Sequence, residues 1–324
     1  MKDTISIIIP TYNRSKTLKN TIVSLISQSF KKENYEILVI DNDSSDDTKE
    51  VVEKIIKDTV GGPTIRYIFE GRPGVHFARN RGAKEAKNEI LYFTDDDMEA
   101  DNNVLEELVK AFQFGNNIGT ATGLVLPKFE VEPPKWILEH CQNSLLSLNV
   151  DKKDNPPMVS KERFGTFNCH QAVDKEVFFK TSGIHPENTK GVWIGSGDMG
   201  LNEDIKRLGF LFAFNPKSVT YHCIPKDRMT QAYINKRLVN QGYADAFSLY
   251  REHQSLPVAF MQTIEYLLRI PYFFIKTVLL FVVSNSQWHL TFGQIYYSFA
   301  RIKYNTLLLF NPQMRKNTIQ KSWL

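Results

Sequence analysis

The stretch Ile90-Leu91-Tyr92-Phe93-Thr94-Asp95-Asp96-Asp97 joins a short apolar run to three consecutive carboxylates. An apolar run of this length predicts a buried strand. Adjacent carboxylates raise one another's pKa unless a cation or strong donors lie nearby. A hard divalent ion, Mg²⁺ or Mn²⁺, relieves the repulsion because it prefers oxygen ligands, and it can bridge two phosphates of a departing diphosphate. The alternative is a solvated loop or an N-cap for a helix over 104–112.

Three earlier apolar runs repeat this pattern and alternate with amphipathic segments of helical spacing. Strands that alternate with helices predict a parallel sheet with right-handed crossovers. The predicted strands are 5–9, 36–40 and 65–69, and the predicted helices are 15–28, 51–56 and 74–86.

Polar clusters follow three of the four strands, at 11–14, 41–47 and 95–97. Ligands of such sheets bind beyond the carboxyl ends of the strands, so the clusters predict one site at one edge. An acidic side chain such as Asp41 commonly accepts hydrogen bonds from a ribose or a base there. Residues 44–47 are more typical of a capped turn.

Composition narrows the class of protein. The chain has 324 residues, 42% hydrophobic and 23% charged, which excludes long disorder, and a net charge of +4 gives no argument for nucleic acid. The cysteines Cys141, Cys169 and Cys223 fit neither a disulfide framework nor a zinc site, which favours reduced thiols in the cytosol. The apolar run 5–9 is too short for a signal peptide and stops at Pro10.

Four segments carry a resemblance to glycosyltransferase family 2. They are Ser6-Ile7-Ile8-Ile9-Pro10-Thr11-Tyr12-Asn13-Arg14, Glu36-Ile37-Leu38-Val39-Ile40-Asp41-Asn42-Asp43-Ser44-Ser45-Asp46, Ala78-Arg79-Asn80-Arg81-Gly82 and Phe93-Thr94-Asp95-Asp96-Asp97, the last resembling the DXD motif. The resemblance spans about 4–225 and is weakest over 127–165. It implies the α/β GT-A fold, a Rossmann-like, mostly parallel sheet flanked by helices. We therefore expect a catalytic domain over 1–225, with nucleotide-sugar binding in about 1–126 and the acceptor side in about 127–225.

The resemblance also implies roles for individual residues. Pro10, Thr11, Tyr12 and Asp41 would hold the nucleobase, and Arg79 and Asp95 would lie near the ribose and diphosphate. The remaining expected donor contacts are Arg14, Asp43 and Asp96. Asp97 would be the main ligand of Mn²⁺ or Mg²⁺, with Asp95 and His222 as further candidates. A structural histidine is the alternative for His222. Lys226 and Arg228 are candidate phosphate contacts, or simply solvated cations.

Inverting transfer needs a carboxylate that takes the proton of the attacking hydroxyl. In the family this acid lies in a Glu-Asp pair at a helix start, about a hundred residues after the DXD motif. Asp198 fits that register here, with Glu203 and Asp204 as rivals. The chain departs from the family at Gly197, which replaces the Glu, and at Gly200, where a second acid is common.

The glycine-containing stretch 183–197 predicts either a lid over the donor or an ordinary loop. Trp193 in this stretch could stack on a sugar ring, and Gly197 lies beside the expected base. Both are candidates for the acceptor side or the lid.

The segment 226–324 predicts a helical C-terminal extension. From Arg251 onward, eight Lys or Arg face two Glu, a balance of +6. Residues 256–284 are largely apolar but carry one polar stripe, and no run reaches the roughly 20 apolar residues of a membrane span. We expect an in-plane helix on a membrane surface. Packing on the catalytic domain, or a homodimer, is the alternative.

The sequence as a whole predicts an inverting, non-processive glycosyltransferase. It would move one sugar from a nucleoside-diphosphate sugar, UDP most often in the family, to a glycan or lipid-linked glycan acceptor in bacterial surface polysaccharide synthesis. The expected location is cytoplasmic, peripheral on the inner face of the cell membrane. A catalytically inactive nucleotide-sugar-binding module or scaffold is the alternative. A nucleotidyltransferase is disfavoured because no glycine-rich, lysine-bearing loop follows the first strand.

Overall fold

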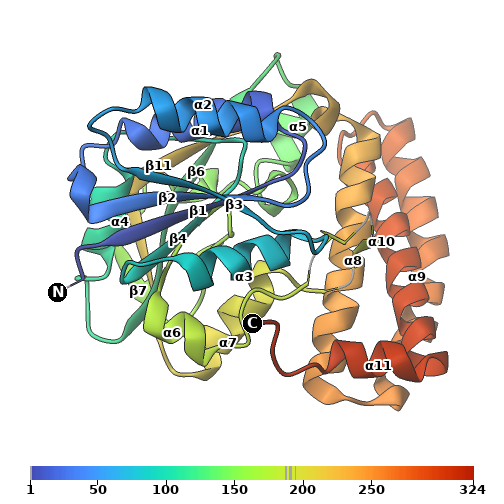
Figure 1. Ribbon diagram of the computed structural model, residues 1–324. Helices are drawn as coiled ribbons and strands as arrows, with labels where there is room; N and C mark the ends of the chain where they lie inside the picture. Colours follow the sequence, from blue (N-terminus) through green and yellow to red (C-terminus); the bar gives the residue numbers. More distant parts are fainter. Residues whose placement is uncertain (1, 187, 190–191, 194) are drawn as a thin grey trace.

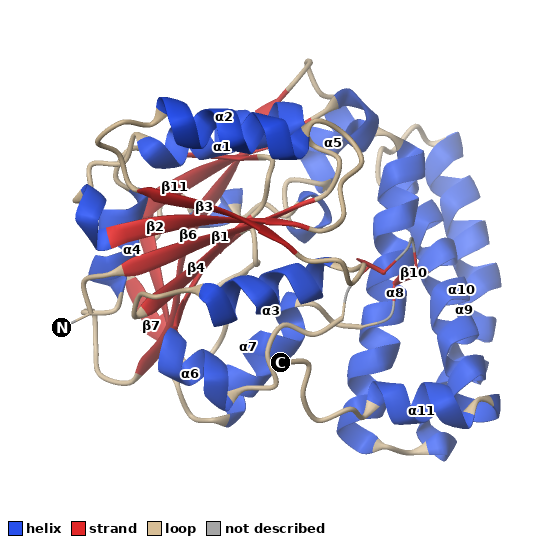
Figure 2. Cartoon of the chain, in the orientation of Figure 1, coloured by secondary structure: helices blue, strands red, loops and turns tan. Residues whose placement is uncertain are grey.

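A computed structural model describes residues 2–186, 188–189, 192–193 and 195–324 of the chain. Its centre is a mixed sheet of nine strands among the described residues, covered by helices on both faces, with a separate group of long helices at one side (Figures 1 and 2). Along the sheet the strands are β3 (Thr64–Phe69), β2 (Tyr35–Asp41), β1 (Ile5–Thr11), β4 (Ile90–Thr94), β8 (His170–Asp174), β6 (Ile118–Phe129), β11 (Leu211–Ile224) and β5 (Met98–Ala100), with β7 (Met158–Ser160) also paired to β11.

The first half of the sheet is parallel, as the alternating pattern predicts. β3, β2, β1 and β4 run in the same direction. β8 enters antiparallel between β4 and β6, and β5 and β7 pair antiparallel with β11. His222, a candidate metal ligand, lies inside β11.

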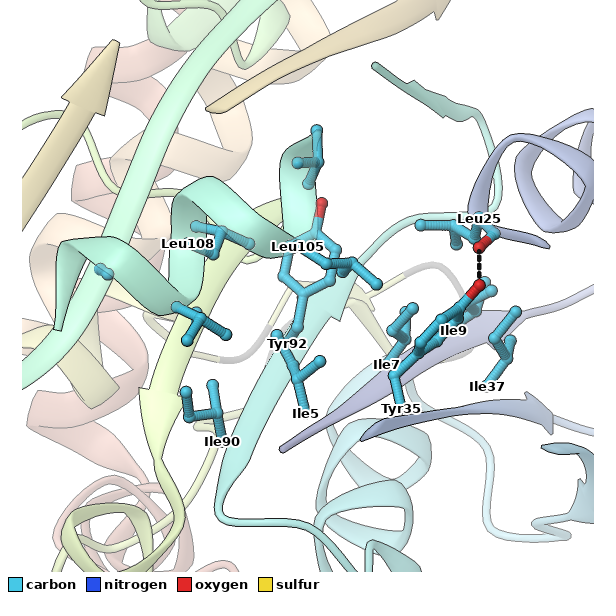
Figure 3. Close-up of a cluster of buried hydrophobic side chains, with 14 of the residues drawn as sticks. Ile5, Ile7, Ile9, Leu25, Tyr35, Ile37, Ile90, Tyr92, Leu105 and Leu108 are labelled. Atoms are coloured by element: carbon cyan, nitrogen blue, oxygen red, sulfur yellow. Dashed lines mark hydrogen bonds between the residues drawn. The ribbon is translucent and has the colours of Figure 1, made fainter. Parts of the chain in front are cut away.

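Side chains alternate between two cores because successive strand residues point to opposite faces. Ile5, Ile7 and Ile9 of β1 pack with helices α1 (Ser15–Ile26), α2 (Thr48–Asp58) and α4 (Val104–Ala111). Figure 3 shows this cluster, in which the hydroxyl of Tyr35 donates to the carbonyl of Leu25 at 3.0 Å. Ile8 faces the opposite core, formed by α3 (Val75–Glu85), α6 (Lys175–Lys180) and α7 (Asp198–Arg207).

The region between β6 and β8 is irregular, as its prolines predict. It contains α5 (Lys135–His140) and the short 3₁₀ turns η2 (Ser144–Leu146) and η3 (Val150–Lys152). Cys141, Cys169 and Cys223 are free thiols, in agreement with their spacing.

The last quarter of the chain is helical. After the turn η4 (Lys226–Met229) come α8 (Gln231–His253), α9 (Leu256–Val282), α10 (Trp288–Phe310) and α11 (Pro312–Thr318). α10 packs against both α8 and α9, and α8 faces the sheet layers (Figure 1). On α9, only Ala259 and Tyr266 are buried, whereas Leu268 and Val282 are 71% and 73% exposed. No helix among the described residues has both the length and the hydropathy that a membrane span requires.

Candidate active site

A cavity of about 590 Å³ opens where β1, β2 and β4 end. It brings together residues far apart in the sequence, from the first strand to helix α8. Its walls comprise Pro10, Thr11, Tyr12, Arg14, Asn42, Asp43, Pro73, Gly74, Val75, Arg79, Asp95, Asp96, Asp97, Ser147, His222, Arg228, Tyr233 and Arg237. The cavity therefore lies at the strand ends, as the polar clusters predict.

Each carboxylate of the acidic triplet has its own partner. Asp95 accepts from Arg79 at 2.7 Å, and Asp96 accepts from the hydroxyl of Thr11 at 2.9 Å. Nη1 of Arg14 donates to Oδ1 of Asp96 at 3.0 Å and to Oδ2 of Asp97 at 2.8 Å. Asp97 is also paired with Arg228 at 2.9 Å. The repulsion within the triplet is thus reduced by arginines of the chain itself.

Burial and neighbouring charges shift the pKa values of this cluster. Burial raises the pKa of Asp96 to about 7, against the attraction of Arg14. The two neighbouring carboxylates outweigh burial at Arg14 and raise the pKa of its guanidinium. The pKa of Asp97 is shifted in the opposite direction, because His222, Arg228 and Arg14 outweigh its burial.

His222 is oriented by a backbone carbonyl. Its Nδ1 donates to the oxygen of Leu146 at 2.8 Å, and its Nε2 accepts from Nη1 of Arg228 at 2.8 Å. A carbonyl cannot donate a hydrogen bond and a guanidinium cannot accept one. These contacts therefore define the neutral tautomer of His222, with its proton on Nδ1 and its lone pair on Nε2. Nε2 lies 3.7 Å from Oδ2 of Asp97. An imidazole held in this way through its other nitrogen is the usual form of a metal-binding histidine.

The pair Asp97 and His222 fits a divalent ion whose other ligands are substrate phosphates and water. Mg²⁺ in enzymes is commonly held by one or two carboxylates plus substrate phosphates and water. The described part of the chain contains no group of three His, Cys, Asp or Glu placed to hold an ion. Asp95, a further candidate ligand, forms an ion pair with Arg79 through Oδ1. Asp97 and His222 would therefore supply one carboxylate and one imidazole to such a site.

Asp41 ends β2 and Asp43 follows it, and the two acids have different surroundings. Asp41 is buried, accepts from the backbone N–H of Ser44 at 2.9 Å and from the hydroxyl of Tyr67 at 2.6 Å, and does not line the cavity. Asp43 does line it, in a left-handed backbone conformation with φ 69°. Asp41 thus shapes the turn, and its neighbours Asn42 and Asp43 face the space where a nucleotide would bind.

Asp198 is the first residue of α7, and Gly197 is its N-cap. Asp198 accepts from the backbone N–H of Asn168 at 3.3 Å. Burial raises its pKa, against the charges of Arg79 and Arg237, both of which line the cavity. Asp198 is not among the described residues that line the cavity, but it interacts electrostatically with Arg79 and Arg237, which do line it.

Local geometry accounts for both glycines that depart from the family pattern. Gly197 has φ 53° and ψ −123°, a conformation that a Glu would adopt only with strain. A Cβ on Gly200 would lie 2.0 Å from Nδ1 of His185. The backbone conformation at position 197 and the packing at position 200 therefore disfavour the acids that the family has there.

The rival acids have other surroundings. Glu203 is exposed. Asp204 is buried, accepts from the backbone N–H of Ser182 at 2.8 Å and pairs with Arg207. These contacts commit Asp204 to holding α7 against the preceding loop.

The backbone of Trp193 forms the short strand β10 (Val192–Trp193) with β9 (Asn188–Thr189). Its side chain falls outside what the structure describes, and so do residues 187, 190, 191 and 194 of the expected lid.

Sequence reasoning missed part of the site. Ser147, Tyr233 and Arg237 line the cavity although they come from the irregular region and the helical extension. Asn168, beside Asp198, is buried, and its side-chain amide has no hydrogen-bond partner among the described residues. The available signal was the spacing of four between Tyr233 and Arg237, which places them on one face of a helix.

Comparisons with solved structures identify the fold. The mannosyltransferase PcManGT from Pyrobaculum calidifontis, solved with GDP-Man and Mn²⁺, has a similar fold, with a TM-score of 0.56 at 17% identity over 94% of this chain and 88% of that one. GalNAc-T7, solved with UDP, GalNAc and Mn²⁺, gives a TM-score of 0.50 at 21% identity over 74% of this chain and 48% of that one. The architecture is the GT-A fold of glycosyltransferases.

A comparison of the sequence with family models identifies the family. Residues 6–181 match the model of Glycosyl transferase family 2, more than half of the chain, and the protein belongs to that family.

Two relatives match shorter stretches. One is the GalNAc(5)-diNAcBac-PP-undecaprenol β-1,3-glucosyltransferase of Campylobacter jejuni, 37% identical over 35% of this chain and 37% of its own length. The other is the poly(ribitol-phosphate) β-N-acetylglucosaminyltransferase TarP of Staphylococcus aureus, 29% identical over 42% of this chain and 41% of its own. The match thus covers less than half of each of these relatives.

Proposed function

We propose that the protein is an inverting glycosyltransferase that moves a single sugar from a nucleoside-diphosphate sugar, UDP being the first candidate, to an acceptor hydroxyl. One observation carries the proposal: the cavity at the strand ends holds the pair Asp97 and His222, and Asp198 lies within electrostatic reach of its walls. A partial metal site and a separate carboxylate with a raised pKa are what metal-assisted transfer to a hydroxyl requires.

The donor half of the cavity would bind the nucleotide through Tyr12 and Asp43, both of which line it. Asp97 and His222 would hold Mn²⁺ or Mg²⁺, which would neutralise the charge of the leaving diphosphate. Arg14 and Arg228, which now pair with Asp97, are within reach of the same region and would donate to phosphate oxygens. In this arrangement the arginines and the acids together orient the donor.

Asp198 would take the proton of the acceptor hydroxyl. Its raised pKa makes it a stronger base than an exposed aspartate. The backbone N–H of Asn168 donates to Oδ2 of Asp198, and among the described residues Oδ1 accepts no hydrogen bond and would be the atom that meets the acceptor hydroxyl.

The acceptor is proposed to be a lipid-linked or polymeric glycan at a bacterial membrane, as the printed activities of the two relatives suggest. The exposed apolar side of α9 supports a position on the inner face of the membrane. It includes Leu267, Leu268, Phe274, Leu279 and Val282, all more than half exposed. Arg269 and Lys276 are exposed on the same helix and would meet anionic headgroups. A homodimer through this face is the competing arrangement.

The test is a donor assay on the full chain. Nucleotide release from a panel of sugar nucleotides, with Mn²⁺ and with EDTA, should show metal-dependent turnover of at least one donor. Metal-dependent binding without turnover of any donor would instead support an inactive nucleotide-sugar-binding module.

A further inference from the structure

Helix α8 contributes to the cavity a cation that forms no ion pair with a carboxylate of the described residues. Arg14, Arg79 and Arg228 are each paired with an aspartate of the triplet. Arg237 lines the same cavity, but within the described residues it forms no ion pair. A guanidinium that faces a cavity without a counter-ion is a binding group for an anion.

The guanidinium of Arg237 is held in place by the turn η2. Its Nε donates to the carbonyl of Leu145 at 3.1 Å, and its Nη2 donates to the carbonyl of Ser144 at 3.1 Å. The next carbonyl of the turn, that of Leu146, accepts from His222. Guanidinium carries five N–H donors, so both donors of Nη1 are left for a ligand. Arg237 is thus fixed by the same turn that orients the proposed metal ligand.

We assign Arg237 to the acceptor side of the cavity. It lies on α8, whereas Tyr12 and Asp43, the residues proposed to contact the nucleotide, follow β1 and β2, and its charge lowers the pKa of Asp198, the proposed base. Tyr233, one helical turn before Arg237, lines the cavity as well and lies under the guanidinium of Arg228 at 5.9 Å.

We propose that Arg237, with Tyr233 beside it, forms an oxyanion subsite that selects an acceptor carrying a phosphate close to the hydroxyl that is glycosylated. This inference rests on the proposed function and specifies its acceptor. The donor diphosphate is the other source of phosphate, and the experiment separates the two.

The experiment uses the full chain with UDP and Mn²⁺ at saturation, so that the donor diphosphate site is filled. Glycerol 3-phosphate is the probe, and glycerol is its uncharged control. Binding is measured by calorimetry for the parent, Arg237→Ala, Arg237→Lys and the matched control Lys236→Ala, which removes an exposed cation from the same helix.

Glycerol 3-phosphate should bind the parent and Lys236→Ala equally. Arg237→Ala should weaken it at least about tenfold, the size expected for a charge-assisted hydrogen bond, and Arg237→Lys should recover part of the loss. Unchanged binding by Arg237→Ala, or equal binding of glycerol, would overturn the proposal. A loss of UDP affinity in Arg237→Ala would assign the residue to the donor and overturn it too. If the parent bound no nucleotide, the proposed function would fail, while the probe without UDP would still report on Arg237.

Discussion

Nη1 of Arg14 donates to Oδ2 of Asp97 at 2.8 Å, so the carboxylate proposed to bind a metal is already paired with a cation of its own chain. Arg228 pairs with the same oxygen at 2.9 Å. A metal ion must compete with both guanidinium groups, and a diphosphate that draws them away would favour its entry. Metal and nucleotide are therefore expected to bind cooperatively.

Arg14→Ala should raise the affinity for Mn²⁺ alone and lower the affinity for UDP with Mn²⁺. Removal of one competing cation favours the metal by roughly tenfold, or about 1.4 kcal/mol. Free Mn²⁺ is measured by its paramagnetic resonance signal. Arg66→Ala is the control, because Arg66 pairs with Glu36 and Glu85 and does not line the cavity. Weaker binding of Mn²⁺ alone by Arg14→Ala would contradict the competition.

Asp97→Asn should abolish the metal dependence of nucleotide binding. Transfer should fall at least about a hundredfold, as when a group that stabilises developing charge is lost. Calorimetry with UDP, with and without Mn²⁺, measures the first effect, and Asp151→Asn is an exposed control. If the variant still bound UDP more tightly with Mn²⁺, Asp97 would not be a metal ligand.

Asp198→Asn should reduce turnover by about 10²–10⁴-fold while the affinity for the donor stays close to that of the parent. Glu203→Gln should have little effect because Glu203 is exposed. Asp204→Asn should lower the melting temperature, since its carboxylate holds Ser182 and Arg207. Near-normal turnover of Asp198→Asn would show that another residue is the general base.

The same residue predicts a pH profile. The base is active only when ionised, and burial raises the pKa of Asp198, so activity should fall with decreasing pH already above the ordinary range of an aspartate near 3.9. The acid limb of kcat/KM measures this in the parent, and the limb should disappear from the residual activity of Asp198→Asn.

Gly200→Ala should destabilise the fold. The added Cβ would meet the ring of His185 at 2.0 Å, and overpacking of this kind costs about 1–3 kcal/mol. Urea unfolding gives the free energy. Gly115→Ala is the matched control, because a Cβ there meets nothing within 4 Å. Equal stability of the two variants would show that α7 moves freely relative to His185.

Leu268→Glu combined with Phe274→Glu should reduce flotation with anionic liposomes at least about tenfold, because burial of each large apolar side chain contributes roughly 1.5–3 kcal/mol. Val60→Glu, at a 93% exposed position far from α9 in the sequence, is the control. A monomer–dimer shift in the double variant, without a change in flotation, would favour the dimer face. A truncation after Tyr250 is unsuitable because it would remove α10, on which α8 packs.

The sequence predicted the parallel half of the fold well because the strands before Asp97 follow one another locally. Each apolar run and its polar cluster lie within a few residues, and the turn carries the functional side chains with it. The irregular region and the antiparallel strands β5, β7 and β8 were not predicted, since their pairing depends on partners far along the chain.

The same reason limits the prediction of the site. Asp97, Thr11 and Arg14 reach the cavity from adjacent strand ends, but Ser147 and Arg237 reach it only through the packing of η2 against α8. The hydrogen bonds that Asp41 accepts from Ser44 and Tyr67 could not be predicted from the sequence, because Tyr67 lies on a neighbouring strand.

Asn80 of α3 joins three parts of the chain. Its side chain bonds to both backbone groups of Ile184 and to the carbonyl of Trp323, partners that lie 104 and 243 positions away. Contacts of such long separation form only after the intervening chain has ordered. On the ribosome, α3 would therefore gain all of these contacts only after Trp323 had emerged, and the cavity itself would be complete only after His222 and Arg228 had joined it.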